Sequence, residues 1–411
     1  ASAGGGLVGL PPRRTPGEEE RKPLRLVVPL LLALALALAP PRGANALAPP
    51  ARRTDIVVWA KPTSPFGRFG HRFKTWASAH VIAELFGWVA LQPHGWAHRG
   101  IVADVFLAKR LGPGPRCPPG LRARQLHCRD FYEPANFTDL QALVRSAVPE
   151  GAHSICLELS HNFRVLLHTV YAWEAQGDAH PGAYAALAKT FRRAMRLGQT
   201  SHWEPATKAV TIAAHLRRGD LSNLRAFAEI PYTLVAHTVD ALPPALDVVV
   251  RLITEPDNST DVFLTGCARV SRILARDTVR PGTERAGRVD CRAVSTSVER
   301  DFGALVYADV LVLSNSGFSV AAGHLRQAAP GGLILEPPGV TQYFPCPNDH
   351  GMPTPANLVC AWTPGLKPWL CARRHKSING TDLPCRWREF YVRGHVVQGV
   401  RSWWRTYRKA Q

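Results

Sequence analysis

Short apolar runs alternate with longer amphipathic segments along most of the chain, from residue 55 to residue 336. Continuous apolar runs rich in β-branched residues are typical of buried strands, and apolar residues recurring every three or four positions are typical of helices. The runs predict strands at Asp55–Trp59, Trp88–Leu91, Ser154–Leu159, Ala209–His215, Leu246–Ile253, Asp309–Leu313 and Leu333–Glu336. The periodic segments predict helices at Arg72–Phe86, Tyr184–Leu197, Val298–Tyr307 and Phe318–Gln327. This alternation predicts an α/β fold built on parallel sheets.

The chain has 411 residues, more than one hydrophobic core usually supports, so we expect two α/β domains with additional tails. Their boundary is expected near Gly198–Lys208. The predicted parts are a tail with a signal or anchor segment and a stem (1–53), a first Rossmann-like domain (54–205), a second Rossmann-like domain (206–345) and a Cys-rich C-terminal extension (346–411). In the extension, Trp403 and Trp404 are interpreted as part of a helix packed on the fold, with an acceptor surface as the alternative.

The N-terminal region indicates the secretory pathway. Basic residues precede an apolar run of about 14 residues, Leu26–Ala39, which suits a signal peptide and is shorter than the ~20 residues that span a bilayer. A short Golgi-type anchor followed by a stem is the alternative. We therefore expect a protein that is secreted or held in the Golgi lumen with type II topology, and that meets the membrane only through this segment.

Sequons and cysteines agree with that location. Acceptor sequences for N-glycosylation begin at Asn136, Asn258 and Asn379. Four of the nine cysteines gather near the C-terminus, at Cys346, Cys360, Cys371 and Cys385. Their gaps lack the paired spacing of a zinc site, so disulfides are the preferred interpretation.

The net charge of +19 predicts attraction to anions. We exclude nucleic acid as the partner, because the basic residues are scattered, without a stripe interleaved with aromatic residues and without a known nucleic-acid-binding module. A solvated basic surface is the alternative to any particular anion site.

The segment His215-Leu216-Arg217-Arg218-Gly219-Asp220 begins at the last residue of the buried strand predicted at Ala209–His215. Ligands of open parallel sheets bind beyond the carboxyl ends of the strands, where two guanidinium groups can make bidentate contacts to a diphosphate. Asp220 can orient one guanidinium, and His215 can hydrogen-bond a phosphate or hold the loop. A surface ion-pair cluster at a strand end is the alternative.

A second segment, Ser314-Asn315-Ser316-Gly317-Phe318-Ser319, lies between a predicted strand and the helix predicted at Phe318–Gln327. Free N–H groups at a helix start attract anions, and the hydroxyls of Ser316 and Ser319 can donate to phosphate oxygens. Ordinary helix capping is the alternative.

A third segment, Gly67-Arg68-Phe69-Gly70-His71, leads into the helix predicted at Arg72–Phe86. Gly67 and Gly70 allow a backbone to approach a ligand or a neighbour closely, and His71 stands at the helix start. A glycine turn that enters a core helix is the alternative.

Taken in order, the three segments resemble the motifs of the GDP-fucose-dependent fucosyltransferase superfamily, which contains α1,2-, α1,6- and protein O-fucosyltransferases. The HxRRGD-like motif is matched by His215–Asp220, the SxSSFS motif resembles Ser314–Ser319, and the GxxGN-type loop resembles Gly67–His71. The sequence departs from the family pattern at Gly317, which replaces a serine, and at His71, which stands where asparagine is common.

The resemblance covers residues 55–345 and implies a GT-B architecture, in which two facing Rossmann-like domains bind the donor mainly through the second. It implies an inverting, metal-independent transfer of fucose from GDP-fucose to a hydroxyl of a glycan or glycoprotein, without a cofactor. The chain agrees in lacking a DxD motif at a strand end.

Without a metal, the departing GDP must be stabilised by protein cations. Arg217 and Arg218 are therefore interpreted as catalytic, with Arg217 on the β-phosphate. Further donor contacts are expected at His215, Asp220, Ser316, Phe318, Ser319 and Gly70. The general base is open among His71, which we include in the catalytic set, Asp220, Glu255 and the leaving phosphate itself.

Two other functions stay open. One is a GT-B transferase that uses another nucleotide sugar, since the motifs indicate a diphosphate more strongly than they indicate fucose. The other is a non-catalytic, secreted, basic glycan-binding protein on the same scaffold.

Overall fold

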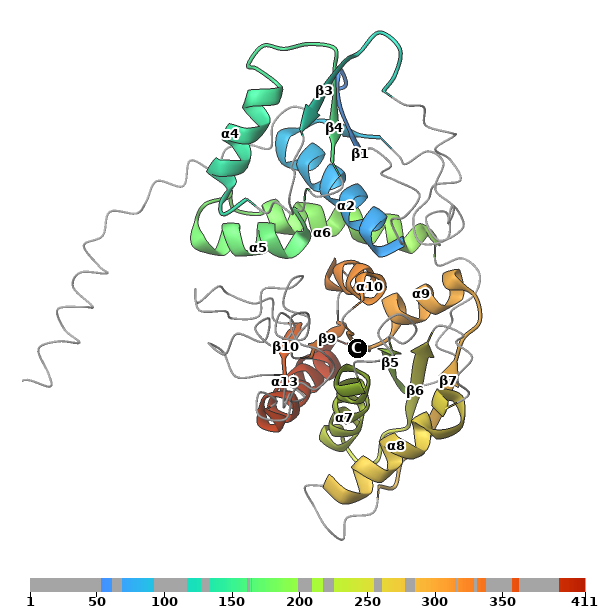
Figure 1. The fold of residues 1–411 in the computed structure, drawn as a ribbon. Coiled ribbons are helices and arrows are strands. Elements are labelled where there is room, and N and C mark those ends of the chain that lie inside the picture. The colour runs from blue at the N-terminus through green and yellow to red at the C-terminus, as the bar shows by residue number, and fades with distance from the viewer. Residues whose placement is uncertain are drawn as a thin grey trace, which may run out of the picture. The chain divides into compact units, whose positions relative to one another are not determined.

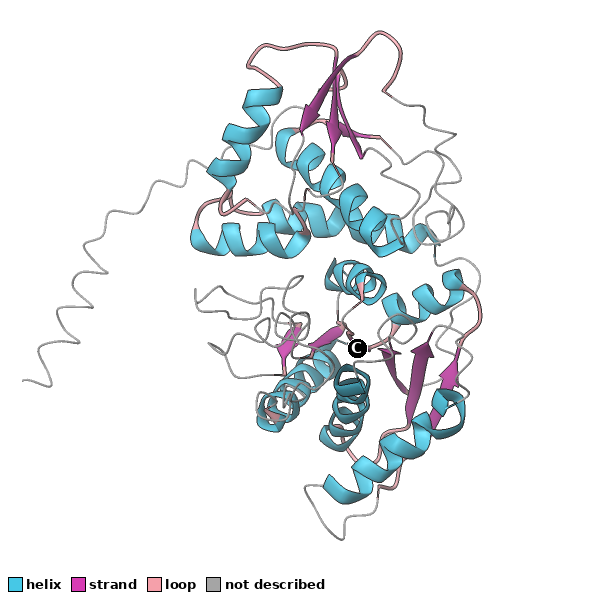
Figure 2. Ribbon diagram, in the orientation of Figure 1, coloured by secondary structure: helices cyan, strands magenta, loops and turns pink. Residues whose placement is uncertain are grey.

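Two parallel β-sheets with their helices form the computed structural model of the protein (Figure 1). The structure describes residues 53–60, 69–91, 117–126, 134–160, 163, 165–198, 209–216, 225–254, 261–277, 285–314, 316–328, 331–337, 357–361 and 392–410. Helices and strands alternate along most of the described chain (Figure 2). The predicted α/β class is therefore confirmed.

The first sheet is formed by the part of the chain before residue 160. Its strands are β1 (Ile56–Ala60), β2 (Val89–Ala90), β3 (Arg122–Leu126) and β4 (Ile155–Leu159), in the order β2-β1-β4-β3. The helices of this half are α2 (Phe69–Phe86), α4 (Phe137–Ala147), α5 (Leu167–Gln176) and α6 (Ala183–Gly198). All neighbouring strands are parallel. The central strand β1 is buried along its whole length, as its apolar sequence predicts.

The second sheet has the strand order of a Rossmann fold. Its strands are β5 (Val210–Leu216), β6 (Val248–Thr254), β7 (Val289–Val294), β8 (Val310–Val312), β9 (Leu333–Glu336) and β10 (Leu358–Cys360), all parallel and in the order β10-β9-β8-β5-β6-β7. The helices of this half are α7 (Arg225–Ala241), α8 (Asp261–Asp277), α9 (Val298–Tyr307), α10 (Gly317–Ala328) and α13 (Arg393–Ala410). Strand order therefore reverses between the neighbours β5 and β8.

One apolar cluster includes side chains from both sheets. It contains Trp76 of α2, Leu325 of α10 and Ile334 of β9, and α10 packs against α2, α5 and α6 as well as against α9 and β9. A second cluster lies on the other face of the second sheet, with α7, α8 and α13. Successive residues of β5 alternate between the two, with Ala213 in the first cluster and Ala214 in the second.

The C-terminal helix α13 is held to the second half by hydrogen bonds as well as by apolar contacts. Trp403 is buried, and its indole Nε1 donates to the carbonyl oxygen of Gly331 at 2.8 Å. The Tyr407 hydroxyl donates to Asp309 Oδ1 at 2.8 Å. Trp404 packs against the second apolar cluster. The interpretation of this segment as a helix packed on the fold is confirmed.

Every strand and helix that the sequence pattern predicts is present, with ends that differ by at most three residues. The elements that the pattern did not predict are β3, β7, β10, α4, α5, α7 and α8.

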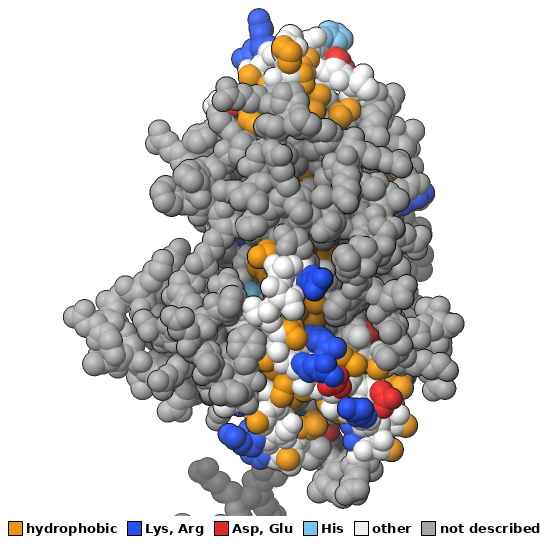
Figure 3. Space-filling model, turned by 90° about the vertical axis from the view of Figure 1, so that its right-hand side faces the viewer, with side chains coloured by type: hydrophobic (Ala, Val, Ile, Leu, Met, Phe, Trp, Pro, Cys, Tyr) orange, Lys and Arg blue, Asp and Glu red, His pale blue; other side chains and the backbone are white. Residues whose placement is uncertain are grey.

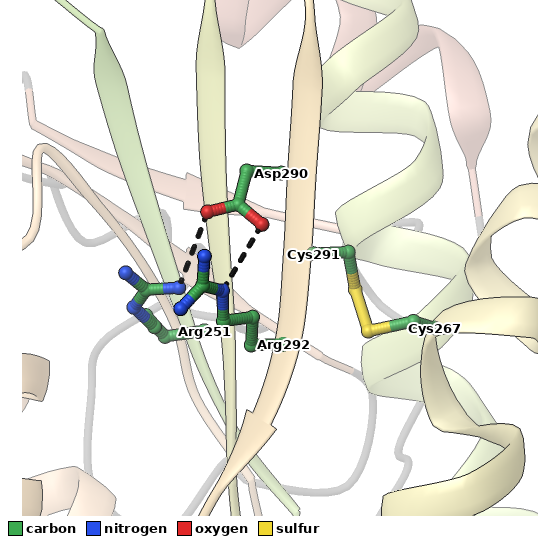
Figure 4. Close-up of a disulfide and its surroundings, with 5 residues drawn as sticks. All are labelled: Arg251, Cys267, Asp290, Cys291 and Arg292. Carbon is green, nitrogen blue, oxygen red and sulfur yellow. Dashed lines mark hydrogen bonds and ion pairs between the residues drawn. A yellow bond between two sulfur atoms is a disulfide. The ribbon is translucent and has the colours of Figure 1, made fainter.

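Two disulfides tie neighbouring segments together. Cys117 before β3 is bonded to Cys156 of β4, and Cys267 of α8 is bonded to Cys291 of β7 (Figure 4). Cys360 of the late cluster is also disulfide-bonded, and the other three cysteines of that cluster lie outside the described residues. Disulfides persist in oxidising compartments, which indicates a secreted or luminal protein.

The predicted signal or anchor segment and the sequons at Asn258 and Asn379 lie outside the described residues. The asparagine of the remaining sequon, Asn136, caps α4, because its Oδ1 accepts from the backbone N–H of Asp139 at 2.7 Å. None of the described helices combines the length and the apolar character that crossing a bilayer requires.

Candidate functional site

The carboxyl ends of β5 and β8 lie side by side where the strand order reverses. The two strands are paired, with Ala214 opposite Val312. The helices that follow them lie on opposite faces of the sheet, since α7 belongs to the second apolar cluster and α10 to the first. Because the connections diverge there, this edge is where parallel α/β sheets bind their ligands. The first two predicted motifs begin at these two strand ends.

His215 and Ser314 connect the two strand ends. Nδ1 of His215 lies 2.7 Å from Oγ of Ser314, and both side chains are buried. The His215 ring also packs against the ring of Phe318, with centroids 5.4 Å apart. Two motifs that are separated by about a hundred residues in the sequence therefore form one cluster of side chains.

Hydroxyl groups fix the start of α10. Ser316 Oγ accepts from the backbone N–H of Phe318 at 3.2 Å. Ser319 is fully buried, and its Oγ accepts from the backbone N–H of Ser314 at 3.1 Å. The same Oγ lies 3.1 Å from the carbonyl oxygens of both Ser314 and Ser316. The Ser316 contact caps the helix, as the alternative interpretation expects, and the Ser319 contacts hold the segment that precedes it. The donation of Ser316 and Ser319 to a phosphate stays a prediction.

The third motif reaches the same helix start. Gly70 lies in the first turn of α2, and a Cβ atom added to it would overlap the carbonyl group of Gly317 and come within 2.6 Å of the Gly317 Cα. The starts of α2 and α10 therefore touch backbone to backbone, which requires a residue without a side chain at Gly70. The close approach expected of Gly70 is thus made to Gly317.

The charged members of the predicted site lie outside the described residues. They are Arg217, Arg218, Asp220 and the base candidate Glu255. His71 belongs to the first turn of α2. The roles of these residues stay predictions. In the sequence, Arg217 comes directly after Leu216, the last residue of β5.

A buried carboxyl group at the same sheet edge was not among the predicted site residues. Glu336 is the last residue of β9, the neighbour of β8, and its side chain is fully buried. Burial raises the pKa of Glu336 well above its ordinary value. Glu336 could have been identified as a site residue from the sequence, because it is the last residue of the strand predicted at Leu333–Glu336.

Helix α10 also carries a buried histidine. His324 is fully buried, and its Nδ1 accepts from the backbone N–H of Leu167, the first residue of α5, at 3.4 Å. The rings of Phe73 and Phe191 pack against it. Burial, together with the nearby His168, lowers the pKa of His324 well below its ordinary value. His324 is therefore neutral in the folded protein.

We expect His324 to make the protein less stable as the pH falls below about 6.5. Below that pH the unfolded chain binds a proton at His324 and the folded chain does not, so acid favours unfolding. The variant His324→Asn keeps an acceptor for Leu167 and cannot titrate. The difference in the free energy of unfolding between the two proteins, measured in urea from about pH 8 to about pH 5, should shrink as the pH falls.

This comparison separates the pH effect of His324 from that of the buried carboxyl group of Glu336. Because the pKa of Glu336 is raised, its carboxyl group favours folding toward low pH, which opposes the effect of His324. That contribution is the same in both proteins and cancels in their difference. A difference that does not change with pH would contradict the prediction.

The strand order of the second sheet, with polar side chains gathered where it reverses, is that of a Rossmann-type α/β protein. Together with the four-stranded parallel sheet of the first half, it makes the fold GT-B-like. No protein-family model matches the chain, and no curated protein matches it. Among solved structures, the chain is similar to the crystal structure of the apo form of POFUT1, with 12% sequence identity and a TM-score of 0.38. The match covers 70% of this chain and 99% of that one.

Proposed function

We propose that the chain is a glycosyltransferase of GT-B type that binds a nucleotide-diphosphate sugar at the carboxyl ends of β5 and β8. One observation carries this proposal: three motifs from distant parts of the sequence meet at one place. His215 of the first contacts Ser314 of the second, and Gly70 of the third contacts Gly317 of the second. Unrelated matches to short motifs would have no reason to share one sheet edge.

The sequence that follows β5 supplies the charge that such a reaction needs. Arg217 and Arg218 come directly after Leu216, the last residue of β5. In the proposed reaction, the oxygen of an acceptor hydroxyl forms a bond to the anomeric carbon, and the bond from that carbon to the β-phosphate oxygen breaks. The hydroxyl proton passes to a base or to the departing phosphate. Negative charge grows on the leaving diphosphate, and guanidinium groups stabilise it without a metal.

The donor is proposed to be GDP-fucose, because the three motifs resemble, in their order and in their residues, the motifs of enzymes that use this donor. The acceptor is proposed to be a hydroxyl group of a glycan or of a glycoprotein, reached in a luminal or extracellular compartment. The disulfides agree with such a compartment.

A thermal-shift experiment with GDP, UDP, CMP and heparin tests the proposal. A ligand that binds the folded state raises its stability by about 2.7 kcal/mol when its concentration is a hundred times the dissociation constant. We expect GDP to raise the melting temperature most among the nucleotides. Stabilisation by none of them would contradict the proposal, whereas a larger shift with UDP or CMP would retain the transferase and replace the donor. Hydrolysis of GDP-fucose in the absence of an acceptor then tests the sugar.

A basic cluster on the second sheet favours a second function, the binding of an acidic glycan. Arg251 of β6 and Arg292 of β7 are register partners, and they share the carboxylate of Asp290 at 3.8 and 3.2 Å (Figure 4). The Arg292 side chain is 64% exposed, and Lys and Arg side chains gather in the lower half of the face in Figure 3. Two guanidiniums with one carboxylate leave a positive cluster that suits a sulfate or carboxylate group. Stabilisation by heparin alone would favour this function over transfer.

A further inference from the structure

Asn136, the half-buried residue directly before α4, offers two different atoms of its side chain. As the N-cap residue it uses Oδ1, which accepts from the backbone N–H of Asp139 at 2.7 Å. As the first residue of the sequon Asn136-Phe137-Thr138 it offers Nδ2, the atom to which an N-linked glycan is attached. The cap and the sequon therefore make use of opposite sides of one amide group.

The neighbours of Asn136 hold this amide group at the surface of the first half. The carbonyl oxygen of Ala135 accepts from the indole Nε1 of Trp173 at 3.2 Å, and Trp173 is buried. The ring of Phe137 packs against the same indole, with centroids 6.1 Å apart. Thr138, the hydroxyl residue of the sequon, is exposed. The sequon thus turns its middle residue to the apolar core and leaves Asn136 and Thr138 at the surface.

The chemistry of the modification leaves the cap intact. Nδ2 loses one of its two protons and forms a bond to the anomeric carbon of a lipid-linked oligosaccharide diphosphate. The bond from that carbon to the phosphate oxygen breaks, and the diphosphate leaves with the electron pair. The carbonyl oxygen Oδ1 keeps both of its lone pairs, so it can accept from the Asp139 N–H after the transfer as before.

The choice of residue at the cap also favours a glycan. Serine, threonine and aspartate cap a helix about as well as asparagine does, because each supplies an acceptor oxygen. Asparagine alone among these adds an amide nitrogen, and here it is followed two positions later by an exposed hydroxyl residue. The two disulfides indicate the oxidising compartment in which N-linked glycans are added.

We propose that Asn136 carries an N-linked glycan on Nδ2 while its Oδ1 caps α4. The glycan is supplied by the glycosylation enzymes of the secretory pathway, and α4 presents it from a position that is anchored on both sides. This modification goes beyond the proposed transfer reaction and does not rest on it. A chain that is glycosylated here and binds no nucleotide contradicts the proposed function alone.

Mass spectrometry of the secreted protein tests the proposal. The full chain is produced in eukaryotic cells behind an added signal peptide, so that it passes through the lumen. An N-glycanase converts a glycosylated asparagine to aspartate, and heavy-oxygen water marks each converted residue. The tryptic peptide Asp130–Arg145 contains Asn136 as its only asparagine. We expect this peptide to be converted and labelled, and recovery of the peptide with an unlabelled, unmodified asparagine would overturn the proposal.

Two variants at Thr138 assign the label to this sequon. Thr138→Ala removes the hydroxyl group that the sequon requires and leaves the Asn136 cap in place, so the label should be lost. The matched control is Thr138→Ser, which keeps a hydroxyl group and should keep the label. Equal labelling of the two variants would overturn the assignment of the glycan to this sequon.

Melting temperatures test whether the cap and the glycan coexist. Asn136→Asp removes the glycan but keeps an acceptor oxygen for the Asp139 N–H, whereas Asn136→Ala removes both. We expect Asn136→Ala to melt about 2 °C below Asn136→Asp, the shift that follows from the usual loss of a cap. The glycosylated wild-type protein should melt at or above the temperature of Asn136→Asp. A glycosylated protein that melts as low as Asn136→Ala would show that the glycan displaces the cap, and the proposed coexistence would be wrong.

Discussion

Replacing Gly70 by alanine is expected to lower the free energy of unfolding by about 3 kcal/mol, at the upper end of the range for overpacked sites. The added Cβ would overlap the carbonyl group of Gly317 and lie 2.6 Å from its Cα. Both partners are backbone atoms, so no side-chain rotation relieves the overlap, and the starts of α2 and α10 must separate. Chemical denaturation of the wild-type and variant proteins measures the change.

A second glycine provides the control for this substitution. Gly394 is also a helical glycine, in α13, but a Cβ added there meets no atom within 4 Å. Gly394→Ala should leave the stability unchanged or raise it by up to about 1 kcal/mol, since alanine favours helix. If Gly70→Ala behaves like Gly394→Ala, the contact between α2 and α10 does not support the fold in the way that we infer. Because this contact also forms one side of the proposed site, Gly70→Ala should weaken stabilisation by GDP as well.

Replacing Arg217 by alanine is expected to lower kcat for transfer by about 10²- to 10³-fold, the usual cost of removing one donor that stabilises developing negative charge. Arg217 follows Leu216, the last residue of β5, in the sequence, and its proposed role is to contact the departing diphosphate. Arg217→Lys should be intermediate, because lysine keeps the charge but cannot make a bidentate contact. Steady-state kinetics with GDP-fucose, together with the melting temperature of each variant, separate lost catalysis from lost folding.

Arg292→Ala is the matched control for the loss of one positive charge. Arg292 lies on β7, an edge strand of the same sheet, and its side chain is largely exposed. Its removal should leave transfer unchanged and weaken retention on heparin, if the second function holds. Near-normal transfer by Arg217→Ala would contradict the assignment of the diphosphate contact to this residue.

Burial explains which strands could be predicted from the sequence. The runs that became β1, β5, β8 and β9 are apolar because both faces of these strands are covered, so their pattern identifies them. The missed strands β3 (RARQL) and β7 (VDCRAV) lie at sheet edges, where polar residues are tolerated and the apolar run disappears. Helix α7 was missed although it is long, because Pro231 in its interior is usually a sign of a helix boundary.

The site was predictable as separate pieces and not as an arrangement. Each motif lies at a strand or helix end, which local patterns reveal. The contact between His215 and Ser314 depends on β5 and β8 being neighbours, although β6 and β7 lie between them in the sequence. Glu336 was missed for a related reason, since a carboxylate at the end of a strand usually faces water and only the assembled fold buries it.

The apolar cluster that spans both sheets limits how modular this protein can be. Helix α10 follows a strand of the second sheet, yet its side chains share a core with α2 and with the first sheet. If either half were expressed alone, the part of this cluster that the other half covers would be exposed to water. Exchanging one half for that of a relative would leave α10 against a surface to which it is not complementary. The two halves are therefore expected to be inherited together, with changes on one side of α10 accompanied by compensating changes on the other.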